Sequence, residues 1–382
     1  MTFDAILLLG FGGPEGPAEV RPFLERVAAG RGIPVERLDE VEQRYLALGG
    51  VSPINAQNRA LRDALALALA ELGRPLPVVL ANRNSPPFVG DALAGLAQPV
   101  TGDVRAEHSE PHTPEERGAS VRVLAVATSA YASYSSCRQY REDVGVALAG
   151  RPELDVEVVK LPPFAGASGL AEATADLLAP ALAEPGRRPH VLFTTHSLPV
   201  AMARISGPET GWPDAESGTP GAYVAQHLAV AEEALTRASA LAGVEVPPWR
   251  LVFQSRSGPP SVPWLEPDIS DALEELAAEG VGDVVVVPIG FLSDHVEVVW
   301  DLDTAAAETA RRLGLRFTRV PTVGTHPAFV AGLAELIAEL DAAATRPPRP
   351  GEACWGDCCR APRRPGLSAE QSARPVIEGV YP

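Results

Sequence analysis

Short, continuously apolar runs alternate with amphipathic segments along most of this chain. Continuous apolar runs are typical of strands that are buried on both faces of a parallel sheet, and amphipathic segments of helical period favour helices that cover such a sheet. The alternation therefore predicts an α/β fold. The expected strands are AILLLGF, LPVVLANRN, VRVLAVATSAY, DVEVVKLPPF, HVLFTTHSLP, WRLVFQSRSGP, DVVVVPIGFL and RFTRVPTVG.

The two halves of the chain repeat this pattern, which predicts two doubly wound α/β domains with parallel sheets. We place the first domain at residues 1–155 and the second at 156–325. A helix at 326–344 is expected to pack back on the first domain. Residues 346–382 are rich in proline and arginine and are predicted to be a cysteine-containing tail. Residues 101–119 are polar and lack periodicity, which indicates a surface loop.

Polar residues interrupt the apolar strands where the strands end. In open α/β sheets, ligands bind outside the carboxyl ends of the strands. A cleft between two such domains would bring these polar segments together, so we expect the functional site there. The segments are Gly12–Glu15, Asn82–Asn84, Thr128–Tyr131, Thr194–Ser197, Gln254–Ser257 and Ser293–Glu297.

Composition excludes several partners and reactions. The 382 residues carry a formal net charge of -17, which disfavours nucleic acid and anionic lipid as partners. Lys160 is the only lysine, so the chain has no Gly-x-x-x-x-Gly-Lys nucleotide loop. The N-terminus has no basic leader, and no apolar run approaches the roughly 20 residues of a membrane span. We therefore expect a cytoplasmic protein without an integral membrane segment.

The segment GFGGPEG resembles a dinucleotide-binding loop but departs from it at two positions. Glu15 stands where the third glycine of Gly-x-Gly-x-x-Gly is needed, and Pro14 lies inside the turn. A carboxylate there would repel a pyrophosphate. A nucleotide-dependent oxidoreductase is therefore a weak alternative. A tight glycine turn can equally bring the backbone close to a flat ligand.

The segment SDHVEVVWDLD places a series of acidic residues directly after an apolar strand. We predict that Asp294 caps a helix that begins near His295. On that helix Asp294, Glu297 and Asp301 would share one face, because they are spaced i, i+3 and i+7. The simplest interpretation is a solvated acidic face. At the end of a buried strand, the same carboxylates fit a path for a divalent cation, since they can replace its water ligands.

His196 ends another apolar strand, in the segment TTHSLP. An isolated histidine of this kind is often a core residue that is hydrogen-bonded to the backbone. A histidine near neutrality can also accept a proton and suits general-base catalysis. Together with Glu297, His196 predicts a site that handles protons and a divalent cation.

The four cysteines are Cys137, Cys354, Cys358 and Cys359. They are either ordinary thiols or ligands, since disulfides are rare in the cytoplasm. Four thiolates suit structural zinc or an iron–sulfur cluster. The adjacent pair Cys358 and Cys359 is awkward for one tetrahedral zinc ion.

The chain resembles the ferrochelatases, which insert ferrous iron into a porphyrin. The motifs that carry the resemblance span most of residues 3–325, and the combination of THSLP and SDHVE is the most specific. The resemblance implies two Rossmann-like, chelatase-like domains with a porphyrin cleft between them. The motifs are LLLGFGGPEGPAEVRPFL, RYLALGGVSPI, ATSAY, TTHSLP, FQSRSGPPSVPWLEP and IGFLSDHVEVVWDLD.

The resemblance also implies roles for individual residues. His196 matches the family's essential histidine, which binds iron or takes a pyrrole proton, and Glu297 matches the essential glutamate. We expect both to be catalytic, to contact the substrate iron and to face opposite sides of the macrocycle. Asp301 matches an acidic position on the path of the substrate iron. Arg44 and Ser52 match positions that contact propionates. Tyr131, Tyr134 and Tyr140 fall in a further porphyrin-contacting segment.

Some bacterial ferrochelatases resemble this chain in holding a [2Fe–2S] cluster with one internal and three C-terminal cysteines. Members of that Gram-positive type use coproporphyrin III, so we predict that this chain makes coprohaem in haem biosynthesis. A monomer that passes coprohaem to a downstream decarboxylase is expected. The alternatives are a protoporphyrin IX ferrochelatase, a cobalt or sirohydrochlorin chelatase, and a non-catalytic porphyrin or haem carrier.

Overall fold

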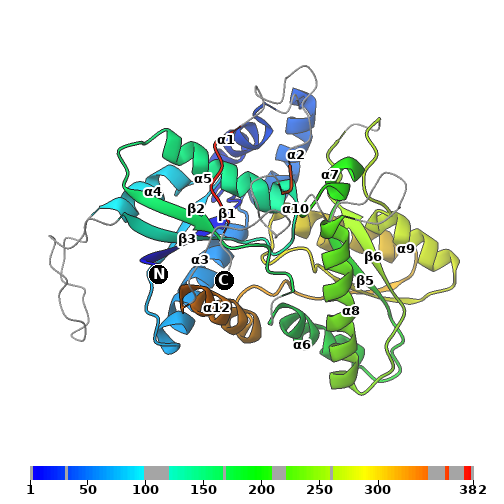
Figure 1. The fold of residues 1–382 in the computed structure, drawn as a ribbon. Coiled ribbons are helices and arrows are strands. Elements are labelled where there is room, and N and C mark those ends of the chain that lie inside the picture. The colour runs from blue at the N-terminus through cyan, green and yellow to red at the C-terminus, as the bar shows by residue number, and fades with distance from the viewer. Residues whose placement is uncertain are drawn as a thin grey trace.

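The computed structural model describes most of the chain. The described residues are 3–30, 33–98, 120–166, 169–208, 221–258, 261–342, 358–360 and 374–379. The predicted loop at 101–119, most of the predicted tail and Cys354 lie outside them. Both predicted sheets are present and wholly parallel, and each of the eight expected strands is found (Figure 1).

The first sheet has the strand order β2-β1-β3-β4. Its central strand β1 is buried at every position, as expected for a strand covered on both faces. In the register, Leu8 of β1 pairs with Leu80 of β2 and with Val126 of β3. The strands are β1 (Ala5–Gly10), β2 (Val78–Asn82), β3 (Val121–Ala127) and β4 (Val156–Lys160).

Helices cover both faces of the first sheet. α4 and α5 pack on one face, around Leu93 and Val144. α3 packs on the other face through Leu61, Leu65 and Leu69, which recur at helical spacing. The helices of this half are α1 (Pro17–Ala28), α2 (Val35–Ala47), α3 (Ile54–Glu71), α4 (Val89–Ala97), the π-helix η2 (Tyr134–Arg138) and α5 (Gln139–Ala149).

The second sheet repeats this plan with the order β6-β5-β7-β8. α9 and the segment that follows β7 cover one face, around Leu273 and Leu302. α6 and α8 cover the other (Figure 1). The strands are β5 (His190–His196), β6 (Trp249–Gln254), β7 (Asp283–Val287) and β8 (Arg316–Arg319). The helices are α6 (Leu170–Leu182), α7 (Val200–Arg204), α8 (Ala222–Ala242), α9 (Ile269–Ala278), α10 (Val296–Val298), the π-helix η4 (Val299–Ala306), α11 (Ala307–Arg312) and α12 (Pro327–Ala342).

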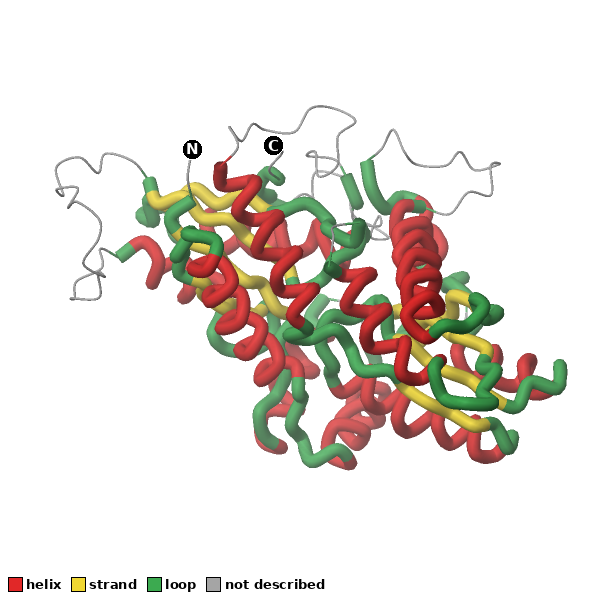
Figure 2. The backbone as a smooth tube through the Cα atoms, turned by 90° about the horizontal axis from the view of Figure 1, so that it is seen from below, coloured by secondary structure: helices red, strands yellow, loops and turns green. Residues whose placement is uncertain are grey.

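One hydrophobic core joins the two halves. It runs from Leu8 in the first sheet to Val285 in the second, so neither half is closed by itself. α12 lies between the halves and contacts both α3 and α6 (Figure 1). In Figure 2, where helices are red and strands yellow, helices lie between the two sheets. β4 pairs with β3, so the first sheet reaches Lys160, beyond the boundary predicted at residue 155. Within the described residues, no helix is both long and apolar enough to span a lipid bilayer.

Candidate active site

The carboxyl ends of the second sheet bring His196 and Glu297 together. His196 is the last residue of β5, and Glu297 lies in α10, which follows β7. The His196 Nε2 atom is 3.9 Å from the Glu297 Oε2 atom, and the side chains are 31% and 47% exposed. The predicted pair therefore shares one open site. A flat ring between the two groups would need roughly 7 Å, twice the contact distance of about 3.5 Å. In this conformation the two groups are therefore too close for a macrocycle to lie between them.

Backbone contacts fix the strand ends that carry this pair. The Gly290 amide donates to the carbonyl of Thr194 at 3.1 Å, which ties the chain after β7 to β5. A Cβ atom on Gly290 would lie 2.1 Å from the Thr195 Oγ1 atom, so only glycine allows this approach. The His196 Nδ1 atom lies 2.5 Å from the carbonyl oxygen of Ser197. Because that oxygen can only accept, Nδ1 carries the proton and the Nε2 lone pair faces Glu297.

Asp301 lies behind the pair, in the π-helix η4. Its carboxylate accepts a hydrogen bond from the Ser255 hydroxyl, just past the end of β6. Burial raises the pKa of Asp301, the Ser255 hydrogen bond opposes the rise, and the charge of Glu297 adds to it. A π-helix has a wider turn than an α-helix and often marks a functional site. The result is a row of two carboxylates that begins at the exposed Glu297 and continues inward to Asp301.

The predicted acidic face is divided between two sites. The helix begins at Val296, next to the predicted start at His295, but Asp294 does not cap it, so the predicted cap was wrong. Instead the Asp294 carboxylate pairs with Arg319 of β8, and Asp303 lies 3.4 Å from the same guanidinium. Asp294 is therefore a structural ion-pair partner, whereas Glu297 and Asp301 point to the His196 side.

The first half of the chain holds the loop that carries these acids. The Ser293 hydroxyl donates to the Asn58 Oδ1 atom at 3.1 Å, and the Asp294 amide donates to the Gln57 Oε1 atom at 2.7 Å. Both amide side chains come from α3. Tyr45 of α2 is buried nearby, and burial together with the charge of Glu297 raises its pKa. The site is thus assembled from both halves, as the predicted cleft requires.

Arg44 and Ser52, the predicted propionate contacts, differ in accessibility. The Arg44 guanidinium lies over the ring of Trp300, 5.8 Å from its centroid, and its charge lowers the pKa of Asp301. In the part of the chain that the structure describes, Arg44 forms no ion pair, so its charge can serve an anionic ligand. Ser52 is buried against Gly13 of the glycine turn, and its amide donates to the carbonyl of Pro14 at 2.8 Å.

The structure does not gather the three predicted tyrosines at His196. Tyr131 is 1% exposed, and its hydroxyl donates to the carbonyl of Ile289 at 3.0 Å. Tyr140 is buried beneath the Arg83 guanidinium, which lies 4.0 Å from its ring centroid. The Tyr134 hydroxyl donates to the Glu142 carboxylate at 3.0 Å. Tyr131 and Tyr140 are core residues in this conformation. A core position is the simpler interpretation of a tyrosine in a sequence, and a porphyrin contact is the other.

Three of the four cysteines meet at a second location. Cys137 of η2, Cys358 and Cys359 are buried and free of disulfides. They line a cavity of about 50 Å³ together with Gly207 and Gln226. The Gly207 amide donates to the Cys359 sulfur at 3.1 Å. The hydrogen bond with Cys358 and burial raise the pKa of Cys359. Among the described residues, no three histidine, cysteine or acidic side chains form a ready-made metal site.

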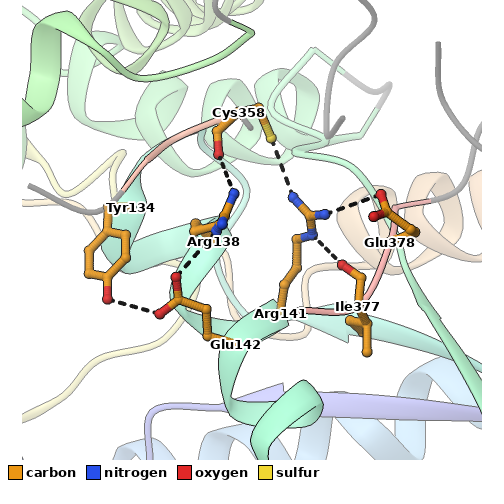
Figure 3. A network of polar contacts seen from close by, with 7 residues as sticks. All are labelled: Tyr134, Arg138, Arg141, Glu142, Cys358, Ile377 and Glu378. Carbon is orange, nitrogen blue, oxygen red and sulfur yellow. Dashed lines mark hydrogen bonds and ion pairs between the residues drawn. The ribbon is translucent and has the colours of Figure 1, made fainter. Parts of the chain in front are cut away.

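Buried cations lie beside two of these thiols, and Figure 3 shows one of them, Arg141, at Cys358. The Lys160 ammonium lies 3.5 Å from the Cys137 sulfur, and the Arg141 Nη1 atom lies 3.5 Å from the Cys358 sulfur. Arg141 also donates to the carbonyl of Ile377 at 2.7 Å, and its guanidinium lies 3.4 Å from the Glu378 carboxylate. Arg141 thereby ties the segment 374–379 to α5. A buried cation beside each of the Cys137 and Cys358 sulfurs favours a thiolate or another anionic group there, whereas the raised pKa of Cys359 favours its neutral thiol.

Sequence reasoning missed two polar contacts at the active site. Ser255 was noted only as part of a polar strand end, and nothing in its neighbours shows that it reaches Asp301. Tyr223 was not singled out, although its hydroxyl contacts both Thr195 and His196. Neither contact has a sequence signal, because both join elements that are distant along the chain.

Comparison with known proteins gives consistent matches. The sequence model of the ferrochelatase family matches residues 3–340. The chain is 46% identical to the coproporphyrin III ferrochelatase of Propionibacterium freudenreichii, over 99% of this chain and 98% of that protein. It is 48% identical to the coproporphyrin III ferrochelatase of Streptomyces coelicolor, over 88% and 85%. Among solved structures, SirB from Bacillus subtilis with Fe3+ aligns over 89% of this chain and 96% of that one, with 11% identity and a TM-score of 0.46.

Proposed function

Because this chain belongs to the ferrochelatase family, we propose that it inserts Fe²⁺ into coproporphyrin III to form coprohaem. The observation that carries the proposal is the open pair of His196 and Glu297, 3.9 Å apart, with Asp301 behind it. Such a site holds a base and a set of oxygen ligands at one place. Relatives named as coproporphyrin III ferrochelatases, at 46% and 48% identity, support the choice of porphyrin.

His196 is proposed to take the two pyrrole protons in turn, releasing the first to solvent at the open site before it accepts the second. Its Nδ1 proton is held by the carbonyl of Ser197, so the Nε2 lone pair is the free basic position. A proton on Nε2 would be stabilised by the Glu297 carboxylate across 3.9 Å. The porphyrin therefore lies on the solvent side of both residues, and the two act on the same face of the ring.

Glu297 and Asp301 are proposed to guide the substrate iron. Carboxylate oxygens are hard ligands that can exchange with the waters of a divalent cation. Asp301 is half-buried and close to Glu297, so the two negative charges in this row repel each other unless a cation enters. That repulsion favours the binding of Fe²⁺ between the two carboxylates, from where it can be passed to the porphyrin ring.

Arg44 is proposed to bind a propionate of coproporphyrin III, which has four. The guanidinium is free of ion pairs within the described residues and lies beside Trp300 and Asp301. Arginine suits this role because its planar donor fork matches a carboxylate. The net charge of -17 repels an anionic porphyrin at long range, so local donors of this kind must supply the attraction.

The proposal is tested by assaying iron insertion into coproporphyrin III and protoporphyrin IX with the wild type, His196→Ala and Glu297→Gln. An enzyme of the proposed type prefers coproporphyrin III, and both variants lose turnover while they still bind the porphyrin. A non-catalytic carrier would bind porphyrin without turnover in the wild type. A clear preference for protoporphyrin IX would overturn the choice of substrate.

Cys137, Cys354, Cys358 and Cys359 are proposed to hold a [2Fe–2S] cluster, with Cys354 lying outside the described residues. The three described thiols and the cavity fit this group. A volume of about 50 Å³ has room for about four water-sized atoms, and Lys160 and Arg141 offset negative charge. When bound, the cluster would cross-link η2 to the segment that contains Cys358 and Cys359.

The cluster is tested by measuring iron, acid-labile sulfide and visible absorption of the purified protein. Lys160→Met is expected to lower the iron and sulfide per chain, because it removes a buried charge beside Cys137. Arg151→Met removes one positive charge from the surface pair with Asp91 and serves as the control. The absence of a cluster in the wild type would contradict the proposal, and full cluster content in Lys160→Met would contradict the role given to Lys160. The monomeric state, the cytoplasmic location and transfer of the product to a decarboxylase remain predictions.

A further inference from the structure

We propose that Tyr223 is a positioning residue for His196, an inference that rests on the proposed role of His196 as the base. Tyr223 lies in the first turn of α8, well separated in sequence from β5. Its side chain is buried, so it does not reach the open part of the site. It acts on the reaction only through the strand end that carries the imidazole.

The Tyr223 hydroxyl bridges two consecutive residues of β5. It donates to the carbonyl of His196 at 2.9 Å. A tyrosine hydroxyl has a single proton. In its contact with Thr195, at 2.7 Å, the threonine hydroxyl therefore donates and the tyrosine oxygen accepts. The hydroxyl group therefore forms a chain from Thr195 through Tyr223 to His196. This chain fixes the peptide of His196, from which the imidazole projects.

The backbone of Tyr223, at the other end of the residue from its hydroxyl, is also held by hydrogen bonds. The Tyr223 amide donates to the Ser206 hydroxyl at 2.7 Å, and that hydroxyl donates to the carbonyl of Ala203 at 2.6 Å. The Tyr223 carbonyl lies 2.7 Å from the His227 Nδ1 atom, and the two rings meet edge to face, 4.5 Å between centroids. A side chain fixed at both ends can transmit a defined position to its partner.

The support continues through His227 to the first half of the chain. The ring of His227 stacks on Tyr131, with centroids 3.5 Å apart and planes 13° apart. The Tyr131 hydroxyl donates to the carbonyl of Ile289, next to Gly290, whose amide donates to Thr194. The contacts thus return to β5 one residue before Thr195. These contacts form a closed ring next to His196. The Tyr223 hydroxyl is the member of that ring that hydrogen-bonds directly to the His196 backbone.

Tyr223→Phe is the test, because it deletes this hydroxyl and keeps the aromatic ring. We expect kcat for metal insertion to fall about 10-fold, within the range that misplacement of a catalytic group causes, while KM for the porphyrin is unchanged. Thr195→Val deletes the other hydroxyl of the chain and should cause a smaller loss. The two effects should be non-additive in the double variant, because each breaks the same chain. Should Tyr223→Phe fail to fold, Thr195→Val still tests the inference through kcat.

The decisive measurement is made in a His196→Ala background. If Tyr223 acts through His196, adding Tyr223→Phe to His196→Ala leaves the residual rate unchanged. A further fall would mean a general structural role and would overturn the inference, as would wild-type kcat in Tyr223→Phe alone. Wild-type turnover in His196→Ala alone would instead refute the proposed function. Thr174→Val is the matched control, since it deletes a buried hydroxyl that donates to Leu170 within α6, and it should leave kcat unchanged.

Discussion

The hydroxyl of Ser255 donates a hydrogen bond to the carboxylate of Asp301 and so joins the end of β6 to the π-helix η4. Ser255 makes this contact from a left-handed backbone conformation, with φ of 61°. Residues other than glycine seldom adopt that region, and such strain concentrates at functional sites. The hydrogen bond also stabilises the ionised form of a carboxylate whose pKa burial raises.

Ser255→Ala is therefore expected to raise the pKa of Asp301 further. A metal-guiding carboxylate must be ionised, so the acidic limb of the dependence of kcat/KM for Fe²⁺ on pH should move to higher pH, with the largest loss at the acidic end. Ser255→Gly removes the same hydroxyl and suits the left-handed backbone, so it should show the same shift. An acidic limb that stays in place in both variants would show that Ser255 does not tune this acid.

The buried histidines predict acid sensitivity of the fold. Burial lowers the pKa of His227 to about 3, whereas an unfolded chain takes up that proton near the ordinary value of 6.5. Between these values the unfolded state binds more protons, so the free energy of unfolding falls as pH decreases, by about 1.4 kcal/mol per pH unit for one such group. His295, with a pKa lowered to about 4 by burial, adds in the same direction.

His227→Phe should reduce this acid sensitivity. Urea unfolding at pH 7 and pH 5 is expected to show a smaller loss of midpoint concentration in the variant than in the wild type, because phenylalanine takes up no proton. The difference between the two pH values is the readout, since the absolute stability also changes with the lost hydrogen bond to Tyr223. An equal pH dependence in both proteins would mean that His227 is protonated in the folded state.

Arg44→Ala is expected to raise KM for coproporphyrin III about 10-fold with little change in kcat, the cost of one hydrogen bond to a charged group. The reason is that Arg44 binds substrate charge and takes no part in proton transfer. Arg62→Ala is a suitable control, because Arg62 is a surface arginine on α3 that pairs with its neighbour Asp63. A fall in kcat at unchanged KM would instead assign Arg44 to the metal path beside Asp301.

Gly145→Ala is expected to displace the segment 374–379. A Cβ atom on Gly145 of α5 would lie 2.5 Å from the carbonyl oxygen of Pro375, which is too close for any side chain. Hydrogen exchange of the Ile377 amide, which donates to Arg141 at 3.3 Å, should become faster. Gly95→Ala in α4 has open space at the same atom and should leave that exchange unchanged. Unaltered protection in Gly145→Ala would show that the segment can shift without opening.

The sequence predicted the architecture because central strands are continuously apolar, as in DVVVVPI, and covering helices such as α3 have apolar residues at helical spacing. It also predicted that His196, Glu297 and Asp301 share a site, since strand ends in parallel sheets meet at one edge. The helix start near His295 was predicted correctly, but its cap was not, because the ion pair with Arg319 takes Asp294 away from the capping position. A partner in β8 cannot be identified from the local pattern.

The tyrosines show a different limit of sequence reasoning. Tyr131 stands at a strand end, where ligand contacts are common, yet it stacks on His227 and closes the core between the halves. Whether an aromatic side chain points to a ligand or into the core depends on packing partners from distant elements. The cysteines were easier, because their clustering in the sequence was itself unusual, and Cys137, Cys358 and Cys359 do meet.

The cavity lined by the cysteines unites parts of the chain that the ribosome makes at very different times. Cys137 emerges early, Gly207 near the middle, and Cys358 only after both sheets have been synthesised. The thiols can therefore converge only once translation has passed residue 360. A cluster held by these thiols, as proposed above, would find its complete site only in a nearly finished protein, which would make its loading a late maturation event rather than a nucleus for folding.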